Sequence, residues 1–514
     1  MLPYTEQTNP LSAMLDGSLD AEQFLLTLKA CDTQVYNGFA AEYSLMDEHI
    51  ITQIERSIDD CCELIKLKDS KIVMTGCGTS GRISFLTARR YNQILSKIRL
   101  NSNDVTLVHT DYFSYTCAGG DSALFLSDEL PEDDPVQSIK DFQTACDNSA
   151  HSMLMGVTCG ISAAYVAGQL AYQMDRTVHK AHIKSSICLV GFNPIELARD
   201  SPIDQLANNY SSFRHLCGGI KQAVDSSTAD CAIINPVIGP EPVAGSSRMK
   251  GGTATLVILD VICLQALFRS GMIPKDHVLY ALNESSTLDL LLEYQRVHSI
   301  TYNHMSKNLP RVMTTAANSV RKKRHLYFVG LDSAGVMGGI DASEMPDTYG
   351  ASFEQTRAFI LHGWEEQGVG SSTGDLSGLS PLHRLGFDHF EADVLPSTTP
   401  DDTVCILLSY PERASSTDLE SLHSLIAKIS AKNVSIFLLC VSTLPLSGLR
   451  NINTLDAIIS LIGGEGQCCF VRLSLLHTGF SDLAIKLMTN AVTTYAQAAG
   501  RGVSAALSYL FDAV

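Results

Sequence analysis

Lys71-Ile-Val-Met-Thr-Gly-Cys-Gly-Thr-Ser-Gly-Arg82 is the stretch that decides the fold of this 514-residue chain. It begins as a β-type run, breaks at three glycines with Thr79 and Ser80 between them, and continues as an apolar helical pattern after Arg82. A strand, a glycine-rich turn and a helix in this order can bind an anion. The turn exposes backbone N–H groups, the hydroxyls donate, and the helix dipole favours negative charge. An ordinary tight βα turn has the same pattern, so the ligand stays open here.

The stretch matches neither of the common nucleotide-binding loops. Its spacing is G-x-G-x-x-G, but no acidic residue ends a second strand about twenty residues later, as a dinucleotide site requires. A Walker loop would need a Gly-Lys pair that is absent from it.

The residues that follow repeat the β-α-β pattern. Strands are predicted at residues 72–75, 105–110, 152–157, 186–191 and 232–235, mostly with helices between them. Such alternation is typical of a parallel sheet whose ligands bind at the carboxyl ends of the strands. The third strand ends in Thr158-Cys-Gly160-Ile-Ser162, a second turn of hydroxyls and glycine. Two such turns on neighbouring strands can hold one phosphate from both sides.

Two further loops have both a structural and a functional interpretation. The acidic residues 128–134 are typical of a solvated loop before a helix, but one carboxylate, Glu132, could reach the site. The loop of residues 235–253 concentrates glycines, prolines, Ser246-Ser247 and the cations Arg248 and Lys250 before a long apolar helix. It suits a second anion contact, an interface, or a helix cap with surface cations.

Composition excludes several classes of protein. The formal net charge of -18 argues against a nucleic-acid partner. The fifteen cysteines show no C-x-x-C pattern and indicate reduced thiols in a cytoplasmic protein, without a metal site or other cofactor. The N-terminus does not resemble a signal peptide, and the apolar run of residues 253–268 contains Asp260 and is too short to span a membrane.

Helices dominate the regions around these strands. They are expected at residues 19–28, with Ser18 as cap, and at 46–67, 163–174, 276 to about 307, and 482–500.

The α/β pattern then occurs a second time. Gly330 ends an apolar strand and opens a Gly-Ser turn, and the strands at residues 404–408 and 435–441 fit the same plan. We therefore predict a duplicated domain with a period of about 250 residues. The copies differ in a complementary way. The first has the Thr79-Ser80 turn but no acid fourteen residues after Gly76, where Arg90 lies, whereas the second has Glu344 fourteen residues after Gly330 but no Thr-Ser pair. Two facing copies would build one composite site, with phosphate on the first and a carboxylate from the second.

Four motifs of this chain resemble one branch of the sugar isomerase (SIS) domains. They are Gly76-Cys-Gly-Thr-Ser-Gly-Arg82, Cys159-Gly-Ile-Ser-Ala, the loop Gly245-Ser-Ser-Arg-Met-Lys-Gly-Gly252, and Asp341-Ala-Ser-Glu-Met-Pro. The branch holds the bacterial N-acetylmuramate 6-phosphate etherases, with one SIS domain per chain, and the animal glucokinase regulatory proteins, with two. The tandem arrangement, with its acid in the second copy only, resembles the regulatory proteins.

The resemblance implies an architecture of two doubly wound α/β domains with helical extensions. Its expected parts are a helical N-terminal segment (1–68), a first SIS domain (69–275), a helical connector (276–324), a second SIS domain (325–480) and a C-terminal helical segment (481–514). The regulatory proteins have a C-terminal helical lid with a lysine contact, most of which we expect to be missing here. They also have a histidine where this chain has Asp347.

The resemblance also implies the site residues. Those expected to bind a phosphorylated hexose or amino sugar are Thr79, Ser80, Glu132, Thr158, Gly160, Ser162 and Glu344. We add Gly78 and Arg248 to the expected binding residues because of the loops in which they lie. In the etherases, the glutamates that match Glu132 and Glu344 act as acid and base. Two hypotheses therefore stay open: a hexose 6-phosphate sensor that regulates a sugar kinase, or a carbon–oxygen lyase of the etherase type. Either would be cytoplasmic, and a sensor that follows its kinase could also be nuclear.

Overall fold

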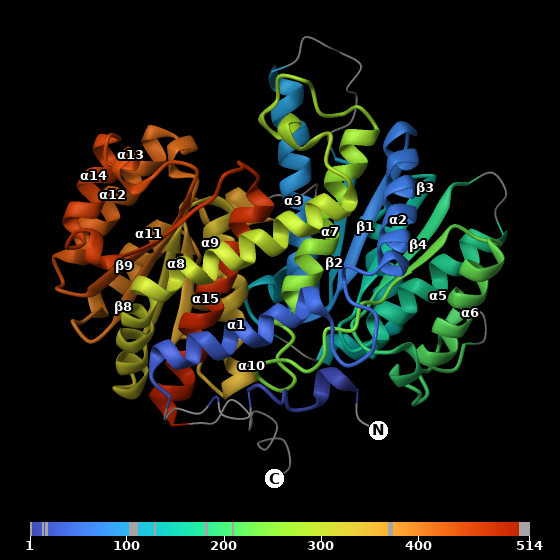
Figure 1. Ribbon diagram of the computed structural model, residues 1–514, viewed down its shortest axis with the longest axis horizontal. Helices are drawn as coiled ribbons and strands as arrows, with labels where there is room; N and C mark the ends of the chain where they lie inside the picture. The colour runs from blue at the N-terminus through green and yellow to red at the C-terminus, as the bar shows by residue number, and fades with distance from the viewer. Residues whose placement is uncertain are drawn as a thin grey trace.

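A computed structural model describes residues 3–12, 15, 19–101, 111–127, 130–179, 183–207, 210–367 and 374–502 of the chain. It contains two five-stranded parallel sheets, one in each half of the molecule (Figure 1). The first sheet has the order β2-β1-β3-β4-β5 and consists of β1 (Ser70–Gly76), β2 (Phe113–Cys117), β3 (His151–Val157), β4 (Ser185–Val190) and β5 (Cys231–Ile234).

The second sheet repeats this topology. It has the order β7-β6-β8-β9-β10 and consists of β6 (Leu326–Gly330), β7 (Thr356–Ile360), β8 (Thr403–Ser409), β9 (Ser435–Ser442) and β10 (Cys468–Arg472). In each sheet the first strand along the chain lies next to one edge, the second strand forms that edge, and the other three follow on the opposite side. The predicted fold of two doubly wound α/β domains is confirmed.

Most of the predicted strands are present within one or two residues. The exception in the first sheet is the strand expected at residues 105–110, part of a stretch that lies outside the described residues. The strand paired with β1 on this side is β2, in which Phe113, Tyr115 and Cys117 alternate with Ser114 and Thr116 over only five residues. In the second sheet the edge strands β7 and β10 were not predicted.

Helices cover both faces of each sheet. Around the first sheet lie α2 (Glu48–Lys66), α3 (Gly78–Asn101), α4 (Pro135–Ala145), α5 (Ala164–His179), α6 (Phe213–Ser226) and α7 (Lys250–Arg269). Around the second lie α9 (Asp332–Ser343), α10 (Met345–Tyr349), α11 (Phe387–His389), α12 (Ser416–Ser430), α13 (Leu446–Leu449), α14 (Asn453–Leu461) and α15 (Thr478–Arg501). The N-terminal helix α1 (Ala21–Asn37) is capped by Asp20, which accepts from Gln23 N–H. The expected cap, Ser18, lies outside the described residues.

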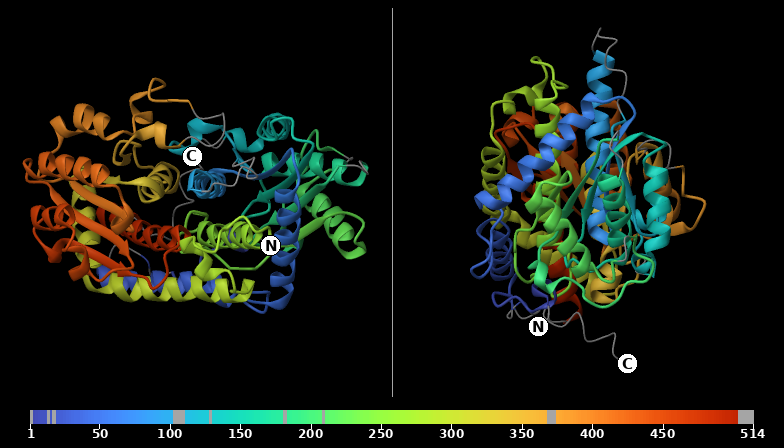
Figure 2. Two further views of the ribbon diagram at one scale, coloured as in Figure 1. Left: turned by 90° about the horizontal axis from the view of Figure 1, so that it is seen from above. Right: turned by 90° about the vertical axis from the view of Figure 1, so that its right-hand side faces the viewer.

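One long helix joins the two halves. The sequence predicted a helix from residue 276 to about residue 307. In the structure α8 (Thr287–Arg321) continues beyond that point and contains Pro310. It packs against α7 of the first half and against α15 and β10 of the second, so it extends along both halves (Figure 2). The burial of Leu309, Met313 and Ala316 against this surface offsets the hydrogen bond that proline removes.

Helix α7 is long and apolar enough to cross a membrane, but all of its apolar window is buried inside the protein. Its position between α2, α3, α8 and α15 explains the run of apolar residues as a core helix.

Candidate functional site

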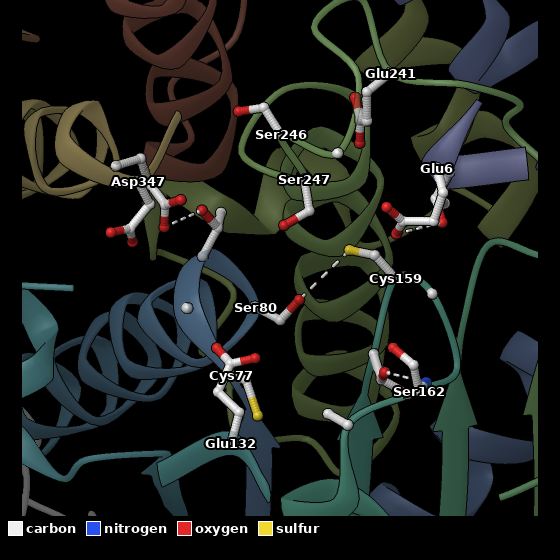
Figure 3. Close-up of a pocket in the computed structure, with 18 of the residues that line it drawn as sticks. Glu6, Cys77, Ser80, Glu132, Cys159, Ser162, Glu241, Ser246, Ser247 and Asp347 are labelled. Carbon is white, nitrogen blue, oxygen red and sulfur yellow. Dashed lines mark hydrogen bonds between the residues drawn. The ribbon is translucent and has the colours of Figure 1, made fainter. Parts of the chain in front are cut away.

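A cavity of about 330 Å³ lies where the two halves meet, at the carboxyl ends of β1 and β3. The turn after β1 contributes Cys77, Gly78, Thr79 and Ser80, and the turn after β3 contributes Thr158, Cys159, Gly160 and Ser162. Glu344, Asp347 and Thr348 reach the cavity from the second half. Figure 3 shows Ser80, Cys159 and Asp347, from three different elements, around one space.

The first turn, residues 76–81, is shaped by its glycines. Gly78 has a φ of 49°, a left-handed conformation that side chains rarely adopt. A Cβ on Gly76 would lie 2.7 Å from the backbone nitrogen of Gly81, so the strand and the start of α3 can approach only without side chains. Thr79 and Ser80 consequently stand in the first turn of α3, where helix N–H groups and the dipole favour an anion.

The second turn, residues 158–162, faces the first across the cavity. The Thr158 hydroxyl accepts a hydrogen bond of 3.3 Å from Ser162 N–H, which closes the turn. Ser80 lies near this turn, with its hydroxyl 3.6 Å from Cys159 Sγ (Figure 3). The two turns thus present hydroxyls toward one volume.

Glu344 connects the second half to the first turn. The Thr79 hydroxyl donates to Glu344 Oε1 at 2.8 Å, although 265 residues separate the two in sequence. The same oxygen is ion-paired with Arg82, whose side chain is 1% exposed. Arg82 also donates from Nε to Ala123 O at 2.9 Å. The carboxylate therefore enters the cavity as one member of a fixed, charge-balanced pair.

Glu132 lies on the other side of the same turn, in the 3-10 segment Leu130–Asp133. A Cβ built on Gly78 would lie 3.6 Å from Glu132 Oε1 and 3.7 Å from Glu344 Oε1. Because both oxygens are so close to a single point, the two carboxylates border the same small space beside the first turn.

Arg248 is the predicted site residue that does not line the cavity. Its side chain is 1% exposed, forms an ion pair of 2.7 Å with Asp341 and donates to Thr494 at 2.7 Å. Lys486 lies nearby and donates to Met249 O at 2.8 Å. These cations fasten the loop of residues 235–249 to α9 and α15, so the structure gives Arg248 a role in joining the halves.

Sequence reasoning missed several residues of the site. Ser246 and Ser247 line the cavity, as do Thr5, Glu6 and Glu241. The two serines stand in a loop that the sequence did single out, whereas no pattern in the N-terminal residues indicated that Thr5 and Glu6 return to the site. Among the described residues that line the cavity, none is lysine or arginine.

Glu241 holds the start of α7 and titrates in an unusual range. Its two oxygens accept from the N–H groups of Lys250 and Gly251, both at 2.8 Å. Burial raises the pKa of Glu241 from 4.5 to about 7, although Lys250 and these N–H groups favour the charged form. The folded protein therefore holds this proton more tightly than the unfolded chain, and stability falls as the pH rises through this interval.

Glu241→Gln should remove this pH dependence. Between pH 4.5 and 7 the free energy of unfolding should fall by about 3 kcal/mol more in the unmodified protein than in the variant, at 1.36 kcal/mol per pKa unit. Urea unfolding at several pH values measures the difference. If the free energy of unfolding depends on pH in the same way in both proteins, Glu241 is already ionised when it is buried.

In the second half, the turn after β6 corresponds to the first turn, and charged side chains of the protein itself surround it. Asp332 has a φ of 47°, as Gly78 has in the first turn, and is paired with Arg89 at 2.9 Å. Arg90 is ion-paired with the buried Asp482 of α15 and with Asp260 of α7. Burial raises the pKa of Asp482, while Arg90 and the hydroxyl of Ser333, the counterpart of Thr79, act in the opposite direction.

Comparison with known proteins agrees with the duplicated architecture. Residues 53–174 match the model of the glucokinase regulatory protein N-terminal SIS domain, and residues 302–473 match that of its second SIS domain. Together the two models match more than half of the chain.

Individual relatives include regulatory proteins and etherases. The chain is 32% identical to the glucokinase regulatory protein of Xenopus laevis over 96% of this chain and 75% of that protein. It is 28% identical to that of Homo sapiens over 86% of this chain and 66% of that protein. An N-acetylmuramic acid 6-phosphate etherase of Edwardsiella ictaluri is 26% identical over 52% of this chain and 71% of the etherase. From both SIS-domain matches and the identity to the frog protein, we conclude that the chain belongs to the glucokinase regulatory protein family.

Proposed function

We propose that this protein binds a sugar phosphate in the cavity between its two halves and acts as a regulatory protein, inhibiting a sugar kinase in response to that ligand. The observation that carries the proposal is the contact of Thr79 with Glu344, because it places the anion-binding turns and a carboxylate of the other half around one cavity. Membership in the glucokinase regulatory protein family supports both parts of the proposal.

The phosphate would be held by uncharged donors. Thr79, Ser80, Thr158 and Ser162 supply hydroxyls, and the start of α3 supplies backbone N–H groups. Gly78 and Gly160 leave room for the ligand to approach the backbone. Since no lysine or arginine lines the cavity in the part of the chain that the structure describes, affinity must come from many oriented dipoles.

The sugar would face the carboxylates. Glu132 and Glu344 can accept hydrogen bonds from hydroxyl groups, and such bonds are strong because the acceptor is charged. Arg82 offsets the repulsion between Glu344 and a phosphate dianion, which would otherwise be large in a cavity of low dielectric. A hexose 6-phosphate or an amino-sugar phosphate has the required anion at one end and hydroxyls at the other.

A test titrates the protein with fructose 6-phosphate, glucose 6-phosphate and an amino-sugar 6-phosphate by calorimetry. It then measures the activity of a glucose-phosphorylating kinase with the protein, in the presence and absence of the ligand that binds. We expect saturable binding of at least one hexose phosphate and kinase inhibition that depends on it. Absence of binding by every sugar phosphate would overturn the proposal.

A lyase of the etherase type is the second candidate. The specific observation in its favour is that Glu132 and Glu344, the pair with the acid and base roles in the etherases, border the same space beside Gly78. Against it, Glu344 is fixed by Arg82 and Thr79, whereas a general acid or base must gain and lose a proton during each turnover.

Glu344→Gln separates the two candidates. For a sensor, the affinity for hexose 6-phosphate should change by less than about fivefold and can rise, because one negative charge leaves the cavity while the amide still accepts from Arg82. For a lyase, release of lactate from N-acetylmuramate 6-phosphate should fall by roughly 10²–10⁴-fold while binding survives.

The matched control for this experiment is Glu354→Gln. Glu354 is exposed in the second half and does not line the cavity, so its substitution removes the same charge without touching the site. Lactate release by the unmodified protein that disappears in Glu344→Gln but persists in Glu354→Gln would establish the lyase. No lactate from either protein, together with retained binding, supports the sensor.

A further inference from the structure

The N-terminal segment, residues 4–9, runs along the edge of the cavity. Thr5 is 4% exposed and Asn9 is 0% exposed, although only three residues of the segment are helical. Tyr4 packs edge-on against Phe39, with 5.5 Å between the ring centroids. Short polar segments are buried in this way only where specific hydrogen bonds fix them.

The first anchor joins this segment to the second turn. Thr5 N–H donates to Asn193 Oδ1 at 3.1 Å, and Asn193 Nδ2 donates back to the Thr5 hydroxyl at 2.9 Å. The same amide donates to Gly160 O at 3.2 Å. Asn193 is 0% exposed and therefore couples the position of Thr5 to residues 158–162.

The second anchor joins the segment to the loop of residues 235–249. Asn9 Nδ2 donates to Pro240 O at 2.7 Å and to Gln34 Oε1 at 2.8 Å. Lys250 Nζ donates to these same two acceptors, at 2.8 and 2.6 Å. The segment is thus held at both ends by elements that themselves line the cavity.

Between the two anchors the segment presents Glu6. Its side chain lines the cavity, and Figure 3 shows it beside Cys159, on the side opposite to Asp347. A carboxylate close to a phosphate dianion is unfavourable, so it is compatible with a sugar phosphate only where it faces hydroxyl groups.

We propose that the N-terminal segment forms one side of the binding site and that Glu6 is a specificity-determining residue. Its carboxylate accepts hydrogen bonds from the hydroxyl groups of the sugar and disfavours anions that carry no sugar. Asn193 and Asn9 are positioning residues that act through the segment. This inference rests on the proposed function and deepens it, because it makes the site selective for a hydroxyl-bearing phosphate ester over free phosphate.

The test compares two ligands on one variant of the full chain. Glu6→Gln should weaken the binding of hexose 6-phosphate about fivefold to tenfold, as a charged hydrogen bond at an exposed position becomes a neutral one. The same variant should bind inorganic phosphate with unchanged or slightly higher affinity, because a repulsive charge has left the cavity. Calorimetry with each ligand measures both effects.

Glu22→Gln is the matched control. Glu22 is exposed in the first turn of α1 and does not line the cavity, so the variant loses the same charge and should bind both ligands like the unmodified protein. A Glu6→Gln variant that loses affinity for both ligands equally would overturn the selecting role, and so would one that gains affinity for both.

Asn193→Leu tests the anchoring separately, because Asn193 does not line the cavity, whereas Thr5 lines it and donates to Glu6 Oε1 at 3.5 Å. The variant removes the amide that binds both Thr5 and Gly160, so it should weaken the binding of hexose 6-phosphate and of inorganic phosphate by a similar factor through the second turn. A loss confined to the hexose phosphate would contradict that route. If the unmodified protein binds no hexose phosphate, the proposed function fails. If it binds one but Glu6→Gln binds it equally well, this inference alone fails.

Discussion

Alanine at both Ser80 and Thr158 should lower the affinity for a hexose 6-phosphate by about two orders of magnitude or more. Hydrogen bonds to charged groups contribute roughly 1.5–3 kcal/mol each, and 1.4 kcal/mol corresponds to a factor of ten. Both side chains line the cavity and are 4% and 5% exposed, so little water is available to replace them. Thr158 also closes the second turn by accepting from Ser162 N–H.

Calorimetric titration of the double variant measures this loss. A double variant with Thr87→Ala and Thr177→Ala is a suitable control. It removes one hydroxyl from α3, the helix that contains Ser80, and one from α5, the helix that follows the turn of Thr158, both at positions outside the cavity. Affinity that stays unchanged in the Ser80 and Thr158 variant would place the phosphate elsewhere.

Replacement of Arg90 by methionine should destabilise the protein by about 3–5 kcal/mol, as is typical when one partner of a buried ion pair is removed. Arg90 is 4% exposed and pairs with Asp260 and Asp482, whose side chains are both 0% exposed. Burial alone would raise the pKa of Asp260, but His477 and Arg90 outweigh it and hold that pKa below its usual range. Methionine would leave Asp482 without its cation.

Urea unfolding measures the change, with Arg99→Met in the exposed end of α3 as control. That variant should stay within about 0.5 kcal/mol of the unmodified protein. Adding Asp482→Leu to Arg90→Met should recover part of the stability, because the second change removes the carboxylate that the first left unpaired. An Arg90→Met variant as stable as the control would show that the ion pairs of Arg90 with Asp260 and Asp482 make no net contribution to the free energy of unfolding.

The repeat of glycine turns made the fold predictable, because each turn follows a strand with a strong apolar pattern. The edge strands β7 and β10 were missed since an edge is partly exposed: Arg357 and Arg472 interrupt the apolar pattern there. The sequence predicted a helical connector at residues 276–324 but did not show that α8 continues unbroken through Pro310, because that depends on tertiary packing.

Part of the site was also accessible from sequence. The offset of fourteen residues after Gly76 and Gly330 indicated that Glu344 would serve the first copy, and the structure places it against Thr79. The same offset could not show that Arg82 pairs with Glu344, because that contact depends on how the halves dock. Arg248 was predicted to bind the ligand because of the loop in which it lies, whereas in the structure its guanidinium is ion-paired with Asp341.

Asp482, the carboxylate at the turn that follows β6 in the second half, has a consequence for the number of ligands that one chain can bind. Two copies of one domain could in principle have bound two ligands per chain. At the turn of the second copy, however, Asp482 already supplies a buried negative charge, and Arg90 supplies its counter-ion from the first copy. An incoming phosphate would have to displace an internal anion that is attached to the chain and therefore always present at high effective concentration. A titration should accordingly saturate at one ligand per chain, and the duplicated half would serve as a permanently occupied partner to the half that senses.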